Sequence, residues 1–115
     1  MIVCRLPPSE PNGDLAASIH TSAFHCFVST ALVDDKWETL IFEGDPGVDE
    51  NWRPHVRLVY PTDCDAHDAG LMNELVATGL DMYGEVGVPL PEASEHVAQG
   101  LIRKGVMVQV FWLGR

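Results

Sequence analysis

Stretches in which apolar side chains alternate with polar ones, or that are rich in β-branched and aromatic residues, predict the strands of this chain. Residues 24–33 and 37–43 are such stretches, and residues 55–60 alternate in the same way. Residues 106–113 are apolar at nearly every position, which is typical of a strand with two covered faces. Residues 2–6 alternate as well, so we expect a sheet of four to five strands.

The connection between the first two of these stretches predicts a tight hairpin. Only Asp34, Asp35 and Lys36 separate them, which suits a two-residue turn. The length of the turn decides which residues face each other across the hairpin. The facing pairs are then Leu32 with Trp37, Val28 with Ile41, and Phe27 with Phe42.

Two helices follow the third strand pattern. Between residues 65 and 83 apolar side chains recur at helical spacing, and Gly84 is placed to end the helix. The second helix covers residues 91–104. It opens with Pro91, whose missing N–H suits the first turn, and it stops at Gly105.

The N-terminal part of the chain is harder to assign. Residues 7–14 contain three prolines and an Asn-Gly pair, which predict a loop. In residues 15–23, Leu15, Ile19 and Ala23 recur at helical spacing, and we expect one or two helical turns there. Strand patterns followed by two helices and a returning strand predict an α+β fold, with an antiparallel sheet and two helices packed on one face.

The composition is that of an ordinary globular domain. Of the 115 residues 46% are hydrophobic and 21% are charged, so we expect residues 1–115 to form one domain. No apolar run approaches the ~18 residues that span a bilayer, and the first residues lack the apolar core of a secretory signal. The three cysteines include no C-x-x-C pair, so we expect no disulfide framework and a reducing, cytoplasmic location.

Acidic residues outnumber basic ones and give the chain a net charge of −10. Residues 34–68 hold ten of the 17 acids against three of the seven bases. Such a field repels nucleic acids and anionic membranes, and it attracts cationic ligands or basic protein surfaces. A simpler alternative is that the acidity only keeps a small protein dissolved.

The densest chemical cluster is the segment DCDAHD, which begins at Asp63. Asp63, Asp65 and His67 fall at the first, third and fifth positions of a calcium-binding loop, with Glu74 at the twelfth. The match fails because Asp68 stands where that loop needs a glycine, and because a strand precedes the segment. Calcium binding is therefore not expected.

The same segment has residue types that serve in other sites. Cys64 and His67 are suitable zinc or iron ligands, but neither H-x-x-x-H nor paired C-x-x-C spacing occurs. Cys64 precedes a helix N-terminus, which lowers a thiol pKa, whereas the neighbouring aspartates raise it. A helix cap explains the cluster with fewer assumptions, since Asp65 suits the N-cap and Asp68 follows three residues later.

The long acidic loop after the hairpin is the candidate binding surface. Trp52 follows Asp49 and Glu50, and Asp45 lies earlier in the same loop. An aromatic ring beside carboxylates suits a cation, so these four residues are the predicted ligand-binding residues. Alternatively, Trp52 folds back onto the sheet as a lid on the core.

These features predict a non-enzymatic binding protein. Its expected partner is an amphipathic organic cation or a basic protein surface, with no cofactor, no metal, no nucleic acid and no membrane. The alternative is a small hydrolase or metal-dependent enzyme that uses Asp63, Cys64, Asp65 and His67.

Apolar residues on both faces of the predicted sheet indicate self-association. Two helices cover only one face of a small sheet. One face of the predicted hairpin carries apolar residues such as Val28 and Ile41, and the other carries Phe27, Leu40 and Phe42. Whichever face the helices leave uncovered would lie in water, so we expect a homodimer packed through the sheet. Trp37 and Trp112 lie in predicted strands, and we expect both in the core.

Overall fold

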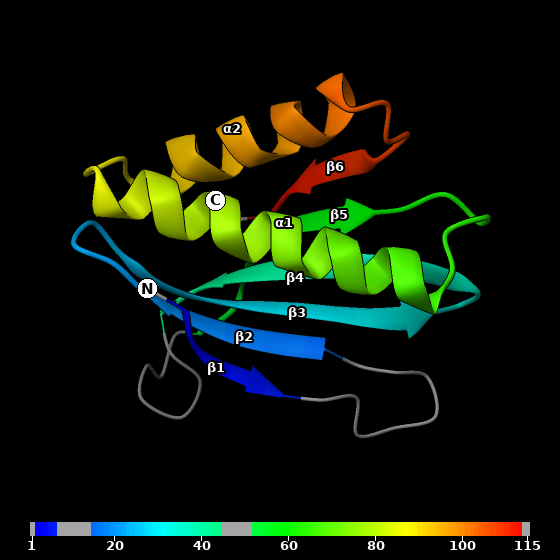
Figure 1. Ribbon diagram of the computed structural model, residues 1–115, viewed down its shortest axis with the longest axis horizontal. Coiled ribbons are helices and arrows are strands. Elements are labelled where there is room, and N and C mark those ends of the chain that lie inside the picture. Colours follow the sequence, from blue (N-terminus) through cyan, green and yellow to red (C-terminus); the bar gives the residue numbers. More distant parts are fainter. Residues whose placement is uncertain (1, 7–14, 45–51, 114–115) are drawn as a thin grey trace.

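The structure of the chain is a computed structural model, which describes residues 2–6, 15–44 and 52–113. Within these ranges the chain forms six strands and two helices (Figure 1). Each strand pairs antiparallel with the next, so that the sheet has the order β1-β2-β3-β4-β5-β6. The elements are β1 (Ile2–Leu6), β2 (Leu15–His20), β3 (His25–Val33), β4 (Lys36–Glu43), β5 (Pro54–Val59), α1 (Ala66–Glu85), α2 (Leu90–Arg103) and β6 (Gln109–Trp112).

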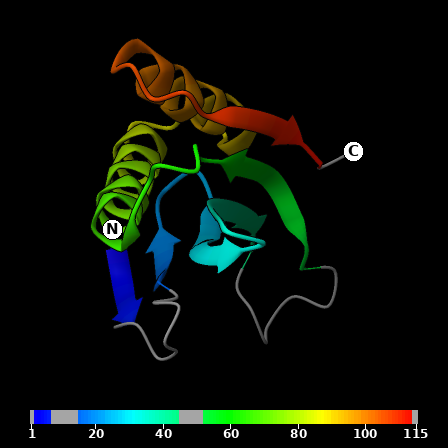
Figure 2. The ribbon, with the colours of Figure 1, turned by 90° about the vertical axis from the view of Figure 1, so that its right-hand side faces the viewer.

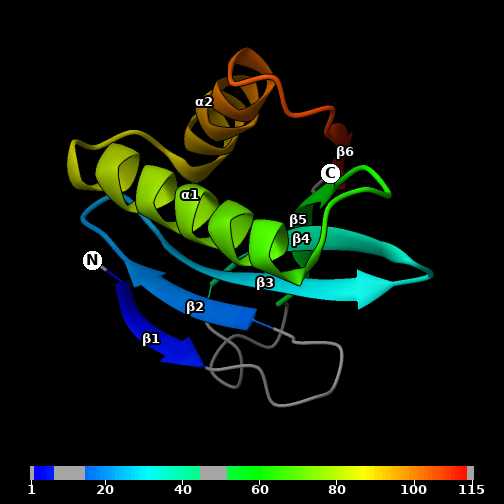
Figure 3. The same cartoon turned by 45° about the vertical axis from the view of Figure 1, so that its right-hand side comes forward.

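The helices form a second layer on one face of the sheet. α1 lies across β2, β3 and β4, and α2 packs beside α1 (Figure 1, Figure 3). Seen from the side, the sheet curves, with β1 at one edge and β6 at the other (Figure 2). The predicted α+β class is confirmed, and the sheet gains a strand beyond the expected four to five because residues 15–20 belong to it.

The expectation of helical turns in residues 15–23 is wrong, because β2 occupies most of this segment. β2 pairs with β1 on one side and with β3 on the other. Ala17 and Ile19 are fully buried, whereas Ala16 and Ser18, which alternate with them, are only half-buried. This alternation has the period of a strand. Pairing with two neighbouring strands outweighs a short helical spacing.

The predicted β3–β4 hairpin is confirmed residue by residue. Asp34 and Asp35 form its turn with φ of 50° and 69°. Both values are left-handed, as the favoured two-residue hairpin turn requires, and aspartate tolerates them better than most residues. The three expected facing pairs are all present: Leu32 with Trp37, Val28 with Ile41, and Phe27 with Phe42.

α1 begins as predicted but ends later. The Asp65 side chain accepts a hydrogen bond from the Asp68 N–H at 2.8 Å and caps the N-terminus. The helix continues through Gly84 and is closed by Gly87, whose φ is 93°. The prediction that Gly84 ends the helix is therefore wrong. This position needs glycine for another reason, since a β-carbon there would overlap the side chain of Thr21.

α2 matches its prediction more closely. Pro91 lies in its first turn, after Pro89 at the N-cap position. Gly105, with φ of 89°, ends the helix, and its N–H donates to the Ile102 carbonyl at 3.0 Å. Among the described residues, neither helix is long and apolar enough to cross a membrane.

The core lies between the helices and the facing side of the sheet. Trp37 is 5% exposed, as expected, but Trp112 is 49% exposed, and its assignment to the core is wrong. β6 is the last strand of the sheet and covers only Gln109–Trp112, so the strand predicted for residues 106–113 is shorter than expected. The fully buried aliphatic side chains of this core include Ile19, Val28, Ile41, Val56, Leu58, Val76 and Leu80.

The opposite face of the sheet is partly covered by the chain itself. The Trp52 ring stacks on Phe42 with 4.2 Å between ring centroids, and its edge approaches Phe27. Beside them Arg57 donates two hydrogen bonds to the Glu38 carboxylate, at 3.1 and 2.9 Å. Trp52 thus folds back onto the sheet, but on the face opposite the core, so it is not a lid on the core. The homodimer through this face stays a prediction.

Candidate functional site

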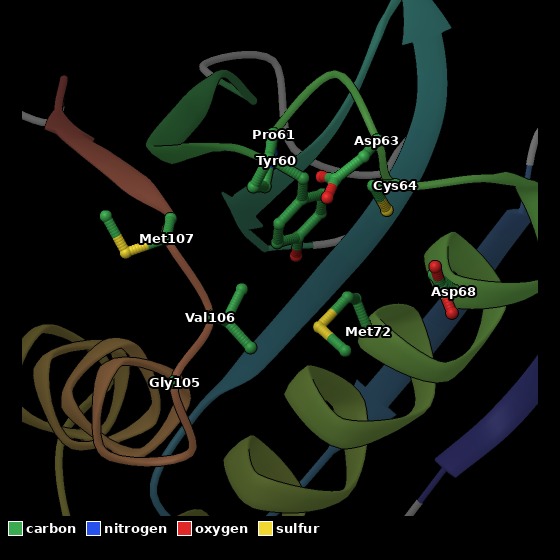
Figure 4. Close-up of a pocket in the computed structure, with 9 residues that line it drawn as sticks. All are labelled: Tyr60, Pro61, Asp63, Cys64, Asp68, Met72, Gly105, Val106 and Met107. Atoms are coloured by element: carbon green, nitrogen blue, oxygen red, sulfur yellow. The ribbon is translucent and has the colours of Figure 1, made fainter.

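A cavity of about 320 Å³ lies where two connections meet the first turns of a helix. One wall comes from the end of β5 and the turn that leads into α1, a second from the first turns of α1, and a third from the connection between α2 and β6 (Figure 4). Its lining residues are Tyr60, Pro61, Asp63, Cys64, Asp68, Met72, Gly105, Val106 and Met107.

Local structure places the acidic side of the cavity. The Cys64 N–H donates to the Pro61 carbonyl at 3.0 Å and closes a tight turn. Asp65 then caps α1, so that Asp63 and Cys64 stay on the turn while Asp68 lies in the first helical turn. The cap therefore orients the whole acidic segment.

The opposite wall depends on the way α2 ends. The left-handed backbone at Gly105 turns the chain away from the helix axis. The Val106 N–H donates to the Leu101 carbonyl at 3.1 Å, which holds the first residue after that turn. Both residues line the cavity on the side opposite Asp63, Cys64 and Asp68. The Val106 side chain points toward Tyr60 and Met72, whereas that of Met107, which is 80% exposed, is directed away from them (Figure 4).

The floor of the cavity is rigid because Tyr60 belongs to a buried chain of hydrogen bonds. Its hydroxyl bonds Thr39 Oγ1 at 2.8 Å, and Thr39 Oγ1 bonds Thr30 Oγ1 at 2.7 Å. Asn73 Nδ2, from α1, donates to Thr30 Oγ1 at 2.8 Å. All four side chains are at most 1% exposed. Such a network fixes the ring, since a buried hydroxyl without a partner is costly.

Burial keeps Tyr60 neutral. It raises the pKa of the phenol well above its ordinary value, whereas the hydrogen bond between the phenol and Thr39 lowers it by less. The ring therefore offers an apolar surface, and its hydroxyl stays a hydrogen-bonded neutral group at physiological pH.

Cys64 is likewise a neutral group in this cavity. Burial is the largest cause that raises the pKa of its thiol to about 11, and the charges of Asp68, Asp65 and Asp63, in that order of importance, contribute to the same rise. A thiolate is the reactive form of cysteine. The arrangement thus favours a passive thiol over a nucleophile.

The four residues of the alternative enzyme hypothesis are only partly brought together. Asp63 and Cys64 line the cavity, and Asp68, not predicted in that role, joins them. Asp65 is the N-cap of α1, and His67 is exposed and outside the lining. Within the described ranges no group of three His, Cys, Asp or Glu side chains is placed to hold a metal ion.

The predicted ligand-binding residues lie elsewhere. Asp45, Asp49 and Glu50 fall outside the described residues. Trp52 is half-buried, with one ring face against Phe42. Ligand binding by these four residues stays a prediction.

Sequence reasoning missed the apolar half of the cavity. The pattern placed Tyr60 in a strand and Met72 in a helix without any sign of a binding role. It placed Val106 and Met107 in the last strand. One signal was available. Gly105 ends a helix, which indicates that the residues after it form a connection before the chain enters its next strand. Their proximity to Asp63 depends on the return of the chain to β5.

Comparison with family models, with curated proteins and with solved structures gives no match to this chain in any of the three.

Proposed function

We propose that this protein binds a small organic cation with an apolar body in the cavity between α1 and the α2–β6 connection. The observation that carries the proposal is the composition of the lining. It combines two carboxylates, Asp63 and Asp68, with the apolar side chains of Met72, Val106 and Met107, and it contains no Lys, Arg or His.

The physical argument concerns the two parts of such a ligand. A cation near the two carboxylates is attracted, and the low-dielectric wall strengthens the attraction. The apolar body leaves water against Val106 and the flexible side chain of Met72, which adapts to different shapes. A cavity of about 320 Å³ is near the small end of the ~300–1,000 Å³ typical of ligand sites. A small molecule therefore fits better than a protein segment.

The net charge supports the same ligand class. With a net charge of −10, the chain attracts cations from a distance and repels anions. No step of covalent chemistry is needed.

The test uses ligands that differ only in charge. Calorimetric titration with benzyltrimethylammonium, benzyl alcohol and benzenesulfonate should give binding for the cation and none for the anion. Asp63→Asn with Asp68→Asn should weaken cation binding at least about tenfold. Asp34→Asn with Asp35→Asn removes the same charge from the hairpin turn, where Asn is equally suited, and should leave binding nearly unchanged.

Three outcomes would overturn the proposal. Equal binding of the anion would remove the electrostatic argument. Loss of binding in Asp49→Asn with Glu50→Gln, but not in the Asp63 and Asp68 variant, would move the site to the acidic loop. Stoichiometric zinc or iron in the purified protein would favour the metal-dependent enzyme instead.

A further inference from the structure

β6 is an edge strand without the features that usually protect such strands. Natural sheets place charged residues, prolines or bulges on their edges, because free backbone groups there recruit other strands. Residues 109–113 contain no charged residue and no proline. Phe111, Trp112 and Leu113 are 40%, 49% and 45% exposed. The edge is thus open both in its backbone and in its side chains.

The other edge of the sheet differs. β1 carries Arg5, and its register with β2 shifts between Ile2 and Cys4. A charged residue and a bulge are two of the devices that discourage strand addition. The sheet therefore has one protected edge and one open edge.

The backbone direction in β6 is set by its pairing with β5. The Leu113 N–H donates to the His55 carbonyl at 2.9 Å, so the backbone of Leu113 points toward β5. The N–H and C=O groups of successive residues point to opposite edges of a strand. Those of Phe111, which is opposite Arg57, therefore also point toward β5. The N–H and C=O groups of Val110 and Trp112 then point away from β5, to the free edge.

We propose that this edge pairs with the same edge of a second copy of the chain, antiparallel and about a two-fold axis at Phe111. In this register Val110 forms a hydrogen-bonded pair with the partner's Trp112, and Trp112 with the partner's Val110. Phe111 faces the partner's Phe111 in the closer, non-hydrogen-bonded type of pair, where aromatic side chains interact well. The strand is complementary to itself, and the two sheets become one.

Charge supports a second copy at this place. Each chain has a net charge of −10, so most ways of bringing two copies together are opposed by repulsion. Residues 96–115 contain no Asp or Glu. The carboxylate of Glu38, the acid nearest to Phe111 along the sheet, is paired with Arg57, which itself lies over the Phe111 ring at 5.2 Å. Two copies that meet at the β6 edge therefore bring few unpaired carboxylates together, which reduces the repulsion between them.

A two-fold pairing also limits the proposed association to two chains. It uses both open edges at once and leaves the protected β1 edges at the two ends of the joined sheet. This dimer differs from the one expected through the sheet face, which Trp52 partly covers. It does not depend on the proposed ligand.

Sedimentation velocity between one and a few hundred micromolar tests the proposal. The expected mass is about twice 12.6 kDa at the upper concentrations. Trp112→Lys should raise the dimer dissociation constant at least about tenfold, because exposed aromatic side chains at the centre of an interface carry most of its binding energy. Leu71→Lys is the matched control: Leu71 is 45% exposed on α1, and its replacement should leave dimerisation unchanged.

Val110→Pro tests the backbone part of the argument. Proline lacks the N–H that faces the free edge, while the groups that pair with β5 stay intact. The variant should keep the monomer's circular dichroism spectrum and lose the dimer. If it fails to fold, Trp112→Lys still decides the question. A mass of 12.6 kDa at all concentrations, or a dimer that survives Trp112→Lys, would overturn the proposal, and so would open-ended polymers.

Discussion

Trp37 and Trp112 both lie in strands and both belong to the helix-covered face of the sheet, yet Trp37 is 5% exposed and Trp112 49%. Trp37 is in β4, which has a strand on each side and α1 above it. Trp112 is opposite Val56 on the edge strand β6. Alternation in the sequence therefore predicts the face of a side chain, whereas its burial depends on the position of its strand in the sheet.

The same contrast separates two regions of the molecule. Around β2, β3 and β4 the face under α1 is closed, and even its polar side chains, Thr30 and Thr39, are fully buried and hydrogen-bonded. Around β6 large apolar side chains remain exposed, and a cavity opens beside Met107. The first region supplies stability, and the second supplies the surfaces that we propose to bind a ligand and a second chain.

Replacing the two tryptophans should give the largest difference. Trp37→Ala leaves a cavity in the core and should lower the free energy of unfolding by about 3–5 kcal/mol. Trp112→Ala should lower it by less than about 1 kcal/mol at concentrations where the protein is monomeric. Guanidinium unfolding at low micromolar concentration measures both. Equal losses would mean that the β6 side is as well packed as the centre.

Two helical glycines should respond in opposite directions. Gly84→Ala pushes a β-carbon into Thr21 and should cost about 1–3 kcal/mol. Gly100, in α2, has open space around its position, so Gly100→Ala should stabilise the protein by about 0.5–1 kcal/mol. Thermal unfolding followed by circular dichroism separates the two. A stabilising Gly84→Ala would show that α1 does not pack closely against the turn after β2.

The buried hydrogen-bond chain predicts a cost for a nearly isosteric change. Thr39→Val leaves the hydroxyls of Thr30 and Tyr60 with one partner fewer and should cost about 1–3 kcal/mol. Thr78→Val is the matched control, because Thr78 is exposed on α1 and its change should stay within about 0.5 kcal/mol. Urea unfolding of both variants decides whether the hydrogen bonds of the Thr39 hydroxyl stabilise the fold, or only the shape of the side chain does.

The smallest expected effect is a pH dependence at Cys64. Its pKa of about 11 lies above the ordinary 9.0, so the unfolded thiol ionises first as the pH rises. Stability from this group is therefore fully present below pH 9 and is lost between pH 9 and about 11. In a Cys4→Ser background, the rate of alkylation by iodoacetamide should reach its half-maximum near pH 11. A midpoint near pH 8–9 would mean that the thiol is open to water.

Local chemistry allowed much of the fold to be read from the sequence. The Asp34-Asp35 turn sets the register of β3 and β4, Asp65 starts α1, and Gly105 ends α2, each through contacts within a few residues. These features are predictable because turns and caps are satisfied by neighbouring backbone groups. The acidic field around residues 34–68 is likewise a property of the sequence alone.

Tertiary structure decided what neighbours along the chain do not determine. Residues 15–20 are a strand because β1 and β3 offer hydrogen bonds on both sides, and Gly84 is buried because Thr21 lies against it. The candidate site exists because the pairing of β6 with β5 brings Met107 to a cavity that Asp63 also lines. Contacts between residues far apart in sequence leave no local pattern, and for this reason the sequence alone predicted the fold class but not the pocket.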